Sequence, residues 1–204
     1  MYKKPIIVFE GIEGSGKSLH INNVASYLKK NGRKFIKIRE PGGNQNSEKI
    51  RKLILSNKSN FDKITDLLLY LAARNENIVN IIKKNIGKRV ILIDRFVDST
   101  IAYQHYGMGI DINFINTINN FLLKNIKVSF TFLNTVNQKN MKFRLKQRRK
   151  LNRYDQFKTL FYKRVQSGFI KIANKNKKKY LIIDSNLNIL VNKKIVIKKI
   201  NKLI

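Results

Sequence analysis

Residues 5–18 read PIIVFEGIEGSGKS, and the architecture expected for the whole chain follows from this stretch. The apolar run 5–10 is typical of a buried strand, and residues 11–18 fit the pattern G-x-x-x-x-G-K-[ST]. A helical pattern opens directly afterwards, near Lys17. Glycines let backbone N–H groups wrap around a phosphate, and the N-terminus of the helix adds a positive dipole end. The stretch therefore predicts a loop that binds ATP or GTP, formed by Gly11, Ile12, Glu13, Gly14, Ser15, Gly16, Lys17 and Ser18.

Four further apolar runs resemble the first, at 34–40, 89–94, 128–133 and 180–184. They are nearly continuous rather than alternating, as strands buried on both faces are. Helical periodicity fills the intervals, over 17–31, 64–84, 111–124, 137–150, 155–175 and 188–203. Such alternation implies right-handed crossovers and a parallel sheet covered on both faces. We therefore predict a three-layer α/β fold and, because no repeat or Pro-rich linker divides the chain, a single domain over 1–204.

The composition excludes several classes of protein. A chain of 204 residues with 43% hydrophobic residues is globular, and no apolar run approaches the roughly 18–20 residues that span a bilayer. The N-terminal apolar stretch Ile6–Phe9 is too short for a signal peptide, so a cytoplasmic location is expected. Cysteine is absent, which excludes disulfides, thiolate catalysis and cysteine-based zinc sites. His20 and His105 alone do not build a metal cage.

The net charge of +31 normally suggests a nucleic-acid ligand. Here the excess is spread along Lys/Asn/Ile-rich stretches such as 174–180 and 191–204. These three amino acids share AT-rich codons, so mutational bias raises them together without selection for a polyanion. We interpret the lysines mainly as solvated surface, with nucleic acid not expected as a partner. The alternative is a field that attracts nucleotide phosphates.

The strand 89–94 ends in Asp94, followed by Arg95. Ligands of open α/β sheets bind at the carboxyl ends of strands, so both side chains are placed near the phosphate loop. Asp94 could orient Mg²⁺ through water together with Ser18, while Lys17 contacts the β- and γ-phosphates and Arg95 faces a phosphate. A surface ion pair is the alternative for Asp94 and Arg95. The guanine-reading motif N/T-K-x-D has no candidate after a strand, which weakens the GTPase hypothesis.

Four further motifs carry a family resemblance. They are REPGG (39–43), ITDLLLYLAAR (64–74), DRFVDSTIAYQ (94–104) and NRYDQ (152–156). In this order the chain resembles the bacterial thymidylate kinases, from Pro5 to about Phe169. The resemblance implies the nucleoside monophosphate kinase fold, with five parallel strands and a mobile lid, in a homodimer. It also implies transfer of the ATP γ-phosphoryl group to dTMP, with Mg²⁺, to supply dTDP for dTTP synthesis.

The resemblance assigns the dTMP contacts residue by residue. Tyr70 stands where the family usually has the phenylalanine that stacks on thymine, and Arg74 follows on the same helix face. Thr100 and Gln104 would complete recognition of the base, and Glu13 suits the deoxyribose 3′-OH. Arg39 has a second interpretation as a structural ion-pair partner. The full set of implied dTMP contacts is Glu13, Arg39, Pro41, Arg51, Tyr70, Arg74, Arg95, Thr100 and Gln104.

The basic segment 144–153, RLKQRRKLNR, lies in the expected lid at approximately 141–155. The chain resembles the short-lid branch, because the phosphate loop has no arginine and the lid has several. Phosphoryl transfer needs positive charge on the transferring group and little covalent help. The expected catalytic side chains are Lys17, Arg95, Arg148 and Arg153. Met108 departs from the family, which usually has arginine there, and puts one loop contact in doubt.

Two rival functions remain open. A deoxynucleoside kinase, or another nucleoside monophosphate kinase, shares the fold; the former needs a carboxylate base for the 5′-hydroxyl and leaves Arg51 without a purpose. A basic ATPase acting on nucleic acid is supported by charge alone, and it predicts binding of single-stranded DNA with a steep salt dependence.

Overall fold

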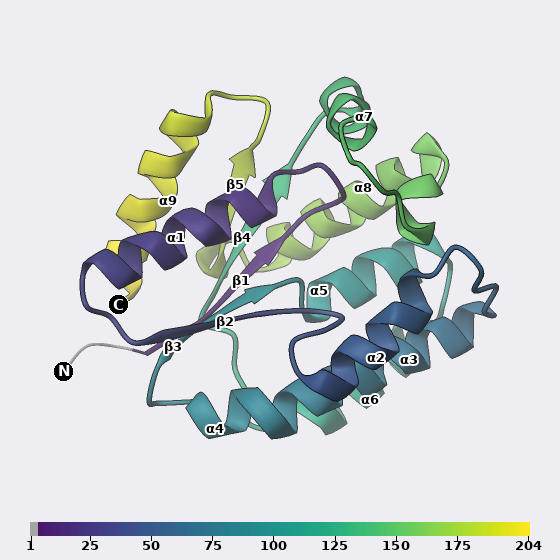
Figure 1. Ribbon diagram of the computed structural model, residues 1–204, viewed down its shortest axis with the longest axis horizontal. Coiled ribbons are helices and arrows are strands. Elements are labelled where there is room, and N and C mark those ends of the chain that lie inside the picture. The colour runs from purple at the N-terminus through teal and green to yellow at the C-terminus, as the bar shows by residue number, and fades with distance from the viewer. Residues whose placement is uncertain (1–3) are drawn as a thin grey trace.

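The computed structural model describes residues 4–204, so Met1, Tyr2 and Lys3 of the N-terminal segment interpreted above lie outside it. Five parallel strands form one sheet in the order β2-β3-β1-β4-β5. Phe9 and Arg39 both pair with Asp94, so the carboxyl ends of three strands lie level at one edge. Figure 1 shows the sheet between layers of helices. The strands are β1 (Ile6–Glu10), β2 (Phe35–Arg39), β3 (Val90–Asp94), β4 (Phe130–Thr135) and β5 (Tyr180–Asp184).

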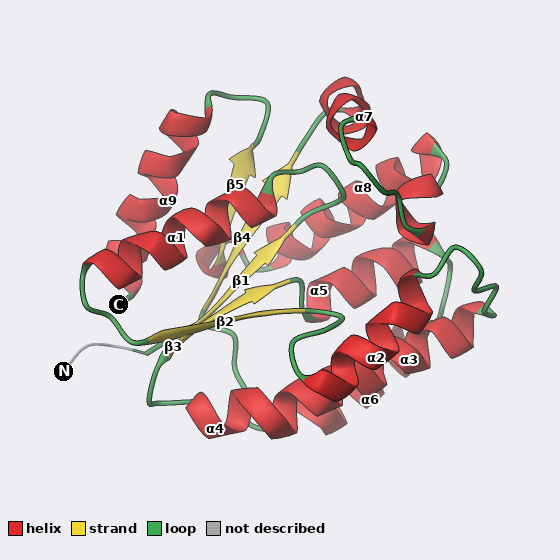
Figure 2. Cartoon of the chain, viewed as in Figure 1, coloured by secondary structure: helices red, strands yellow, loops and turns green. Residues whose placement is uncertain are grey.

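Helices cover both faces of the sheet (Figure 2). Successive residues of β1 point to opposite faces, and all five are apolar or buried, as a central strand requires. Ile7 and Phe9 pack toward α1 and α9, and Ile6 and Val8 pack toward η1 and the end of α6. The helices are α1 (Lys17–Lys30), α2 (Gln45–Leu55), α3 (Lys63–Asn77), η1 (Ile78–Ile82), α4 (Lys83–Asn85), α5 (Val97–Thr100), η2 (Ile101–Gly107), α6 (Ile112–Leu123), α7 (Gln138–Lys146), η3 (Arg153–Gln156), α8 (Thr159–Lys175), η4 (Lys177–Lys179) and α9 (Ile189–Leu203).

The predicted α/β fold and its five strands are confirmed, with strand ends within two residues. The helical prediction over 64–84 is confirmed as α3, which continues through a π-helical segment into α4. The prediction missed α2, α5 and η2.

The predicted ends of two helices near the expected lid were wrong. The helix expected to reach 150 ends at Lys146, and the one expected from 155 begins at Thr159. Asn152 and Asp155 form a capping box that winds 153–156 into a short 3₁₀ helix. The extended backbone at Phe157 and Lys158 then separates it from α8.

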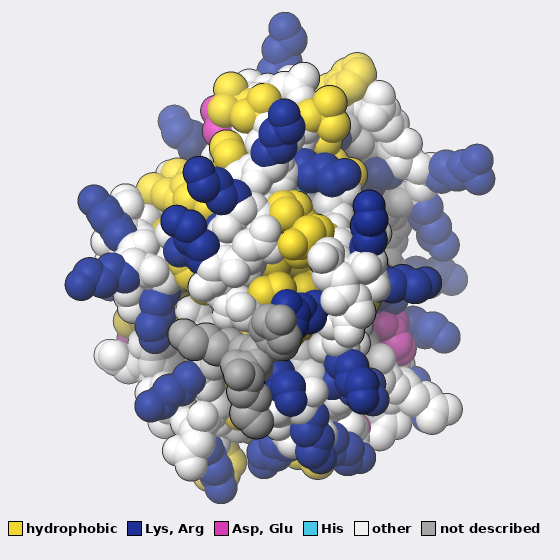
Figure 3. All heavy atoms as spheres, turned by 90° about the vertical axis from the view of Figure 1, so that its left-hand side faces the viewer, with side chains coloured by type: hydrophobic (Ala, Val, Ile, Leu, Met, Phe, Trp, Pro, Cys, Tyr) yellow, Lys and Arg dark blue, Asp and Glu magenta, His cyan; other side chains and the backbone are white. Residues whose placement is uncertain are grey.

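The positive charge is dispersed over the surface. Figure 3 shows one face of the molecule, on which Lys and Arg side chains are scattered and apolar side chains lie between them. Several of the exposed apolar residues belong to α9, including Leu190 and Val191. Within residues 4–204, no helix has the length and apolar character needed to cross a bilayer.

Candidate active site

A cleft of about 220 Å³ opens at the carboxyl edge of the sheet. It collects residues from the phosphate loop, β2, β3, α2, α3, α5, η2 and the segment after α7. Arg153 is not among its lining residues. The predicted site residues that line it are Glu13, Lys17, Ser18, Arg39, Pro41, Arg51, Tyr70, Arg74, Asp94, Arg95, Thr100, Gln104 and Arg148.

The phosphate loop needs its glycines for steric reasons. Gly11 has a φ of 140°, and a Cβ on it would lie 2.3 Å from the backbone oxygen of Asn134. Gly16 caps α1 in the left-handed conformation, with a φ of 83°. Ser15 Oγ is buried and has no hydrogen-bond partner within residues 4–204. An orphaned hydroxyl inside a glycine loop at a helix N-terminus suits an anionic oxygen as its partner.

Lys17 lies inside this loop and is only 7% exposed. Its Nζ donates to the backbone oxygen of Ile12 at 3.1 Å. Burial, together with the positive charge of Arg95, lowers the pKa of Lys17 to about 8. The ammonium is thus poorly solvated, and a bound polyphosphate would restore favourable interactions to it.

Ser18 and Asp94 meet at the entrance to the loop. The Ser18 hydroxyl donates to Oδ2 of Asp94 at 3.3 Å. Both groups offer hard oxygen ligands, which Mg²⁺ prefers, and Mg²⁺ commonly keeps waters and substrate phosphates as its other ligands. Within residues 4–204 there is no group of three or more histidine, cysteine or acidic side chains that could hold a metal by itself. The pair therefore fits an ion that arrives with a nucleotide.

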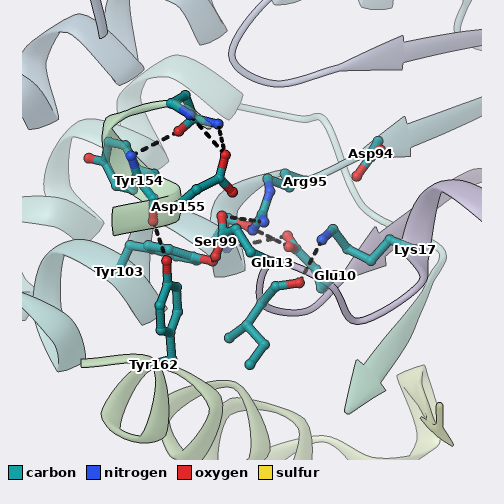
Figure 4. Close-up of polar contacts among 12 residues, drawn as sticks. Glu10, Glu13, Lys17, Asp94, Arg95, Ser99, Tyr103, Tyr154, Asp155 and Tyr162 are labelled. Atoms are coloured by element: carbon teal, nitrogen blue, oxygen red, sulfur yellow. Dashed lines mark hydrogen bonds and ion pairs between the residues drawn. The ribbon is translucent and has the colours of Figure 1, made fainter. Parts of the chain in front are cut away.

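Arg95 is held in an unusual backbone conformation beside the loop. Its φ is 67°, in the left-handed region that non-glycine residues rarely adopt. Its guanidinium donates to Oε1 of Glu13 at 2.8 Å and stacks over the ring of Tyr103, 5.1 Å from the centroid. The Tyr103 hydroxyl donates to the other oxygen of Glu13 (Figure 4). Glu13, Arg95 and Tyr103 therefore fix one another at the cleft wall.

Glu10 anchors the chain that follows Arg95. Its carboxylate accepts from the backbone N–H of Phe96 at 2.8 Å. It also accepts from the Ser99 hydroxyl at 2.5 Å (Figure 4). Burial, and then the nearby charge of Asp98, raise the pKa of Glu10 to about 7. The end of β1 thus determines where the segment from β3 into α5 runs.

Arg74, one of the predicted base-reading residues, is almost fully enclosed, with 2% exposure. Its Nε donates to Glu40 at 2.8 Å and one Nη donates to Asn119 at 2.6 Å. The other Nη donates to the Phe96 carbonyl and to the Thr100 hydroxyl, at 2.9 and 2.8 Å. Four of the five guanidinium N–H groups are then engaged, which leaves one for a ligand.

Two further arginines border the opposite wall. Arg51 donates to the carbonyl of Pro41 at 2.6 Å, and burial lowers its pKa from the ordinary value. Arg39 makes a bidentate ion pair with Glu48, with both oxygens at 3.0 Å from Nη2. The alternative interpretation of Arg39 as an ion-pair partner therefore matches its position, although its exposed side chain also lines the cleft.

The basic segment after β4 divides into three arginine environments. Arg144 bridges the carbonyls of Gly14 and Ser185, at 2.8 and 2.7 Å. Arg148 pairs with Asp155 and is partly exposed at the cleft. Arg153 instead pairs with Asp66 on α3 and donates to the carbonyl of Ile54 at 3.1 Å. The geometry thus separates an arginine that faces the cleft from one that ties this segment to α2 and α3.

Several residues with clear structural roles in the cleft were not singled out from the sequence. Glu10 directly precedes the phosphate loop, Glu40 lies inside REPGG and Tyr103 lies inside AYQ, so each stood in a quoted motif without an assigned role. Asp66 and Tyr154 also lie in quoted motifs, but nothing in the sequence indicates that they are partners, because they are 88 residues apart.

The chain is similar to known thymidylate kinases in sequence and in structure. The family profile for thymidylate kinase matches residues 9–195. A thymidylate kinase of Sulfurihydrogenibium sp. (strain YO3AOP1) is 38% identical over 193 residues, covering 94% of each chain. A thymidylate kinase of Bacillus licheniformis is 33% identical over 202 residues, covering 97% of this chain and 93% of its own. The crystal structure of thymidylate kinase from Ehrlichia chaffeensis superposes with a TM-score of 0.79 at 33% identity, covering 97% and 98% of the two chains.

Proposed function

This chain belongs to the thymidylate kinase family and phosphorylates dTMP to dTDP with ATP as donor, and we propose that the cleft described above seats the reaction. The observation that carries the proposal is the meeting of Lys17, Tyr70, Arg74 and Gln104 around one cavity. A phosphate-binding loop at one end and an aromatic ring with hydrogen-bonding groups at the other suit a pyrimidine nucleotide facing a triphosphate.

The donor occupies the phosphate loop in this proposal. The ATP phosphates are surrounded by the backbone N–H groups of Gly11, Ile12, Glu13, Gly14, Ser15, Gly16, Lys17 and Ser18. The Lys17 side chain contacts the β- and γ-phosphates. The buried, orphaned Ser15 hydroxyl supports an anion there. Ser18 and Asp94 would hold Mg²⁺, Asp94 through water, and the ion would neutralise charge on the phosphates when bound.

The acceptor base lies between Tyr70 and the hydrogen-bonding residues. The Tyr70 ring supplies an apolar face for stacking, and Arg74 has one N–H left for the base edge. Thr100 holds Arg74 in place, and Gln104 offers its amide to the base. Pro41 forms part of the wall. Buried hydrogen-bonding groups discriminate strongly between bases, since a mismatched base leaves them unpaired.

The acceptor phosphate would lie among Arg39, Arg51 and Arg95. Glu13, fixed by Arg95 and Tyr103, suits the deoxyribose 3′-OH. The attacking 5′-phosphate oxygen is ionised at neutral pH, so in-line transfer needs no general base. Arg95 and Lys17 therefore contribute position and positive charge rather than proton transfer.

The segment 141–155 acts as the lid in our proposal, within a single catalytic domain spanning 1–204. Arg148 lines the cleft and is partly exposed, so a small closure would bring it onto the transferring phosphoryl group. Arg153 would contribute indirectly, because its bonds to Asp66 and Ile54 tie the end of the lid to α2 and α3.

A nucleotide panel tests the substrate assignment. ATP and Mg²⁺ are mixed with one acceptor at a time, and ADP release is measured with a coupled assay. The acceptors are dTMP, dUMP, UMP, CMP, dCMP, dAMP, dGMP and thymidine. We expect the highest kcat/KM with dTMP. With thymidine, a deoxynucleoside that lacks the 5′-phosphate, we expect no ADP release above background. ADP release with UMP or CMP but not with dTMP would contradict the assignment. Omitting Mg²⁺ in the presence of a chelator is expected to abolish turnover.

The two rival functions make different predictions in the same experiments. A deoxynucleoside kinase would release ADP with thymidine, whereas the cleft holds Arg39, Arg51 and Arg95 for a substrate that already carries phosphate. A nucleic-acid-dependent ATPase would hydrolyse ATP when single-stranded DNA is added, with a steep dependence on salt. On the face shown in Figure 3, the positive side chains are scattered and do not form a track for a strand.

We propose a homodimer formed through α3, with the chain acting in the cytoplasm. The outer face of α3 and η1 carries five exposed residues at helical spacing, Ile64, Leu68, Ala72, Asn75 and Val79. The neighbouring helices α2 and α6 pack against α3 in the layer seen in Figure 1, and each has an exposed large apolar side chain, Leu53 and Phe121. All of the five stripe residues except Asn75 are apolar, and an exposed apolar stripe is typical of a surface covered by a partner.

Leu68→Glu is expected to give monomers at concentrations where the unaltered chain has twice its 23.9 kDa mass. A carboxylate at the centre of an isologous interface meets its symmetric copy, and both lose solvation. Size-exclusion chromatography with light scattering measures the mass. Leu160→Glu, at another exposed leucine, on α8, is the matched control and should leave the dimer intact. A monomeric mass for the unaltered chain would contradict the proposal.

A further inference from the structure

The hydroxyl of Tyr154 links the side chains of Asp66 and Gln104 at the base end of the cleft. Tyr154 lies in η3, is 4% exposed and lines the cleft. Its hydroxyl donates to the buried carboxylate of Asp66, which also pairs with Arg153. Nε2 of Gln104 donates to the same hydroxyl at 3.3 Å.

The donor and acceptor roles at this junction are fixed by counting protons. A tyrosine hydroxyl has one proton to donate and accepts at most two hydrogen bonds. Burial raises the pKa of Tyr154 well above its ordinary value, so the proton stays on the phenol. That proton is committed to Asp66, because an ionised carboxylate only accepts. Gln104 must therefore donate to Tyr154.

This assignment fixes the direction of the Gln104 amide. The NH₂ group points to Tyr154, so the carbonyl oxygen Oε1 points elsewhere. Among residues 4–204, no donor bonds Oε1 of Gln104, and this oxygen is not among the buried orphaned atoms. Gln104 thus presents an acceptor, not a donor, to the space in the cleft.

We propose that Tyr154 and Asp66 are positioning residues that set the orientation of the Gln104 amide and thereby select against cytosine. The inference rests on the proposed function, in which Gln104 faces the base. Thymine and uracil carry a proton on N3 and can donate it to Oε1. Cytosine has a lone pair at N3, so its N3 and Oε1 would be two acceptors facing each other, with no hydrogen bond between them.

Tyr154→Phe tests the inference through the ratio of kcat/KM for dTMP to that for dCMP. Without the hydroxyl, the Gln104 amide is free to rotate and present its NH₂ group to cytosine. We expect the ratio to fall by at least about tenfold, while Arg74 preserves part of the discrimination. Asp66→Asn is a second route to the same result. Its amide can donate to Tyr154, which frees the Tyr154 proton for Gln104 and favours the opposite orientation of that amide.

Two controls separate orientation from folding. Tyr162→Phe removes a neighbouring hydroxyl that donates to the main-chain carbonyl of Tyr154 and not to its side chain, so the ratio should not change. Thermal midpoints of all variants establish that they are folded. If Tyr154→Phe and Asp66→Asn both keep the ratio within threefold of the unaltered chain, the inference is wrong. If the unaltered chain itself fails to phosphorylate dTMP, the proposed function is what fails.

Discussion

Lys17→Met is expected to lower kcat by at least about 10²–10³-fold while leaving the protein as stable as before, or more stable. The ammonium is the one lysine group inside the phosphate loop, and transfer depends on positive charge that is already in place. Methionine keeps the length and removes the charge. Because burial lowers the pKa of Lys17 to about 8, the folded state disfavours the charged form, and removing it relieves that cost. ADP release and thermal midpoint are the two measurements.

Lys29→Met is the matched control, since Lys29 is an exposed lysine on the same helix. It should retain the turnover and stability of the unaltered chain. Turnover of Lys17→Met within about fivefold of normal would contradict the role assigned to the ammonium. A lower midpoint for Lys17→Met than for Lys29→Met would contradict the argument from burial.

The pH profile gives a second measure of the same group. In the free enzyme the Lys17 ammonium is present below about pH 8 and is lost as pH rises through that value. We therefore expect kcat/KM for ATP, which reports the free enzyme, to decline through that range. Bound polyphosphate favours the ammonium, so kcat should decline at higher pH. In Lys17→Arg the guanidinium stays charged, and this decline should be absent even if overall activity is reduced.

The placement of Lys17 and Asp94 in one cleft could be predicted from the sequence, because parallel strands end at the same edge. Asp94 closes β3 and the phosphate loop follows β1, and these two strands are neighbours. The helix α2 could not be predicted in this way. It buries only Ser47 and Ile54, and its apolar residues are confined to its second half, so it gives no sustained apolar pattern. The segment η2 was not predicted for a related reason. It buries Gln104 at a position where a helical apolar pattern would have an apolar residue.

The environment of Arg74 marks the limit of the sequence argument. Its position four residues after Tyr70 predicts a shared helix face, and both residues line the cleft. The spacing does not predict that Arg74 is buried against Glu40, 34 residues earlier, or against Asn119, 45 residues later. Such partners depend on how α3, β2 and α6 pack. They follow from tertiary contacts and have no local signature.

Arg74→Met is expected to reduce the free energy of unfolding by about 3–5 kcal/mol near pH 7.5. Glu40 and Arg74 are an ion pair with side chains only 4% and 2% exposed, at 2.8 Å. Removing the guanidinium leaves the Glu40 carboxylate buried without its cation, and leaves Oδ1 of Asn119 without its donor. Urea unfolding followed by circular dichroism measures the change. A loss below about 1 kcal/mol would contradict the claim that this pair holds β2 against α3.

The size of that loss should depend on pH, with a sign that follows from Glu40. Burial already raises the pKa of Glu40 above its ordinary value of 4.5, while Arg74 opposes the rise. Without Arg74 the pKa rises further, so the folded variant binds a proton that the unfolded chain releases. Stability then falls as pH rises above 4.5, and the difference from the unaltered chain should be smaller at pH 5.5 than at pH 7.5. In Glu40→Gln/Arg74→Met no carboxylate remains to titrate, so the loss should be smaller at pH 7.5 and nearly independent of pH. If the double variant shows the same pH dependence as Arg74→Met, a group other than Glu40 is responsible for it.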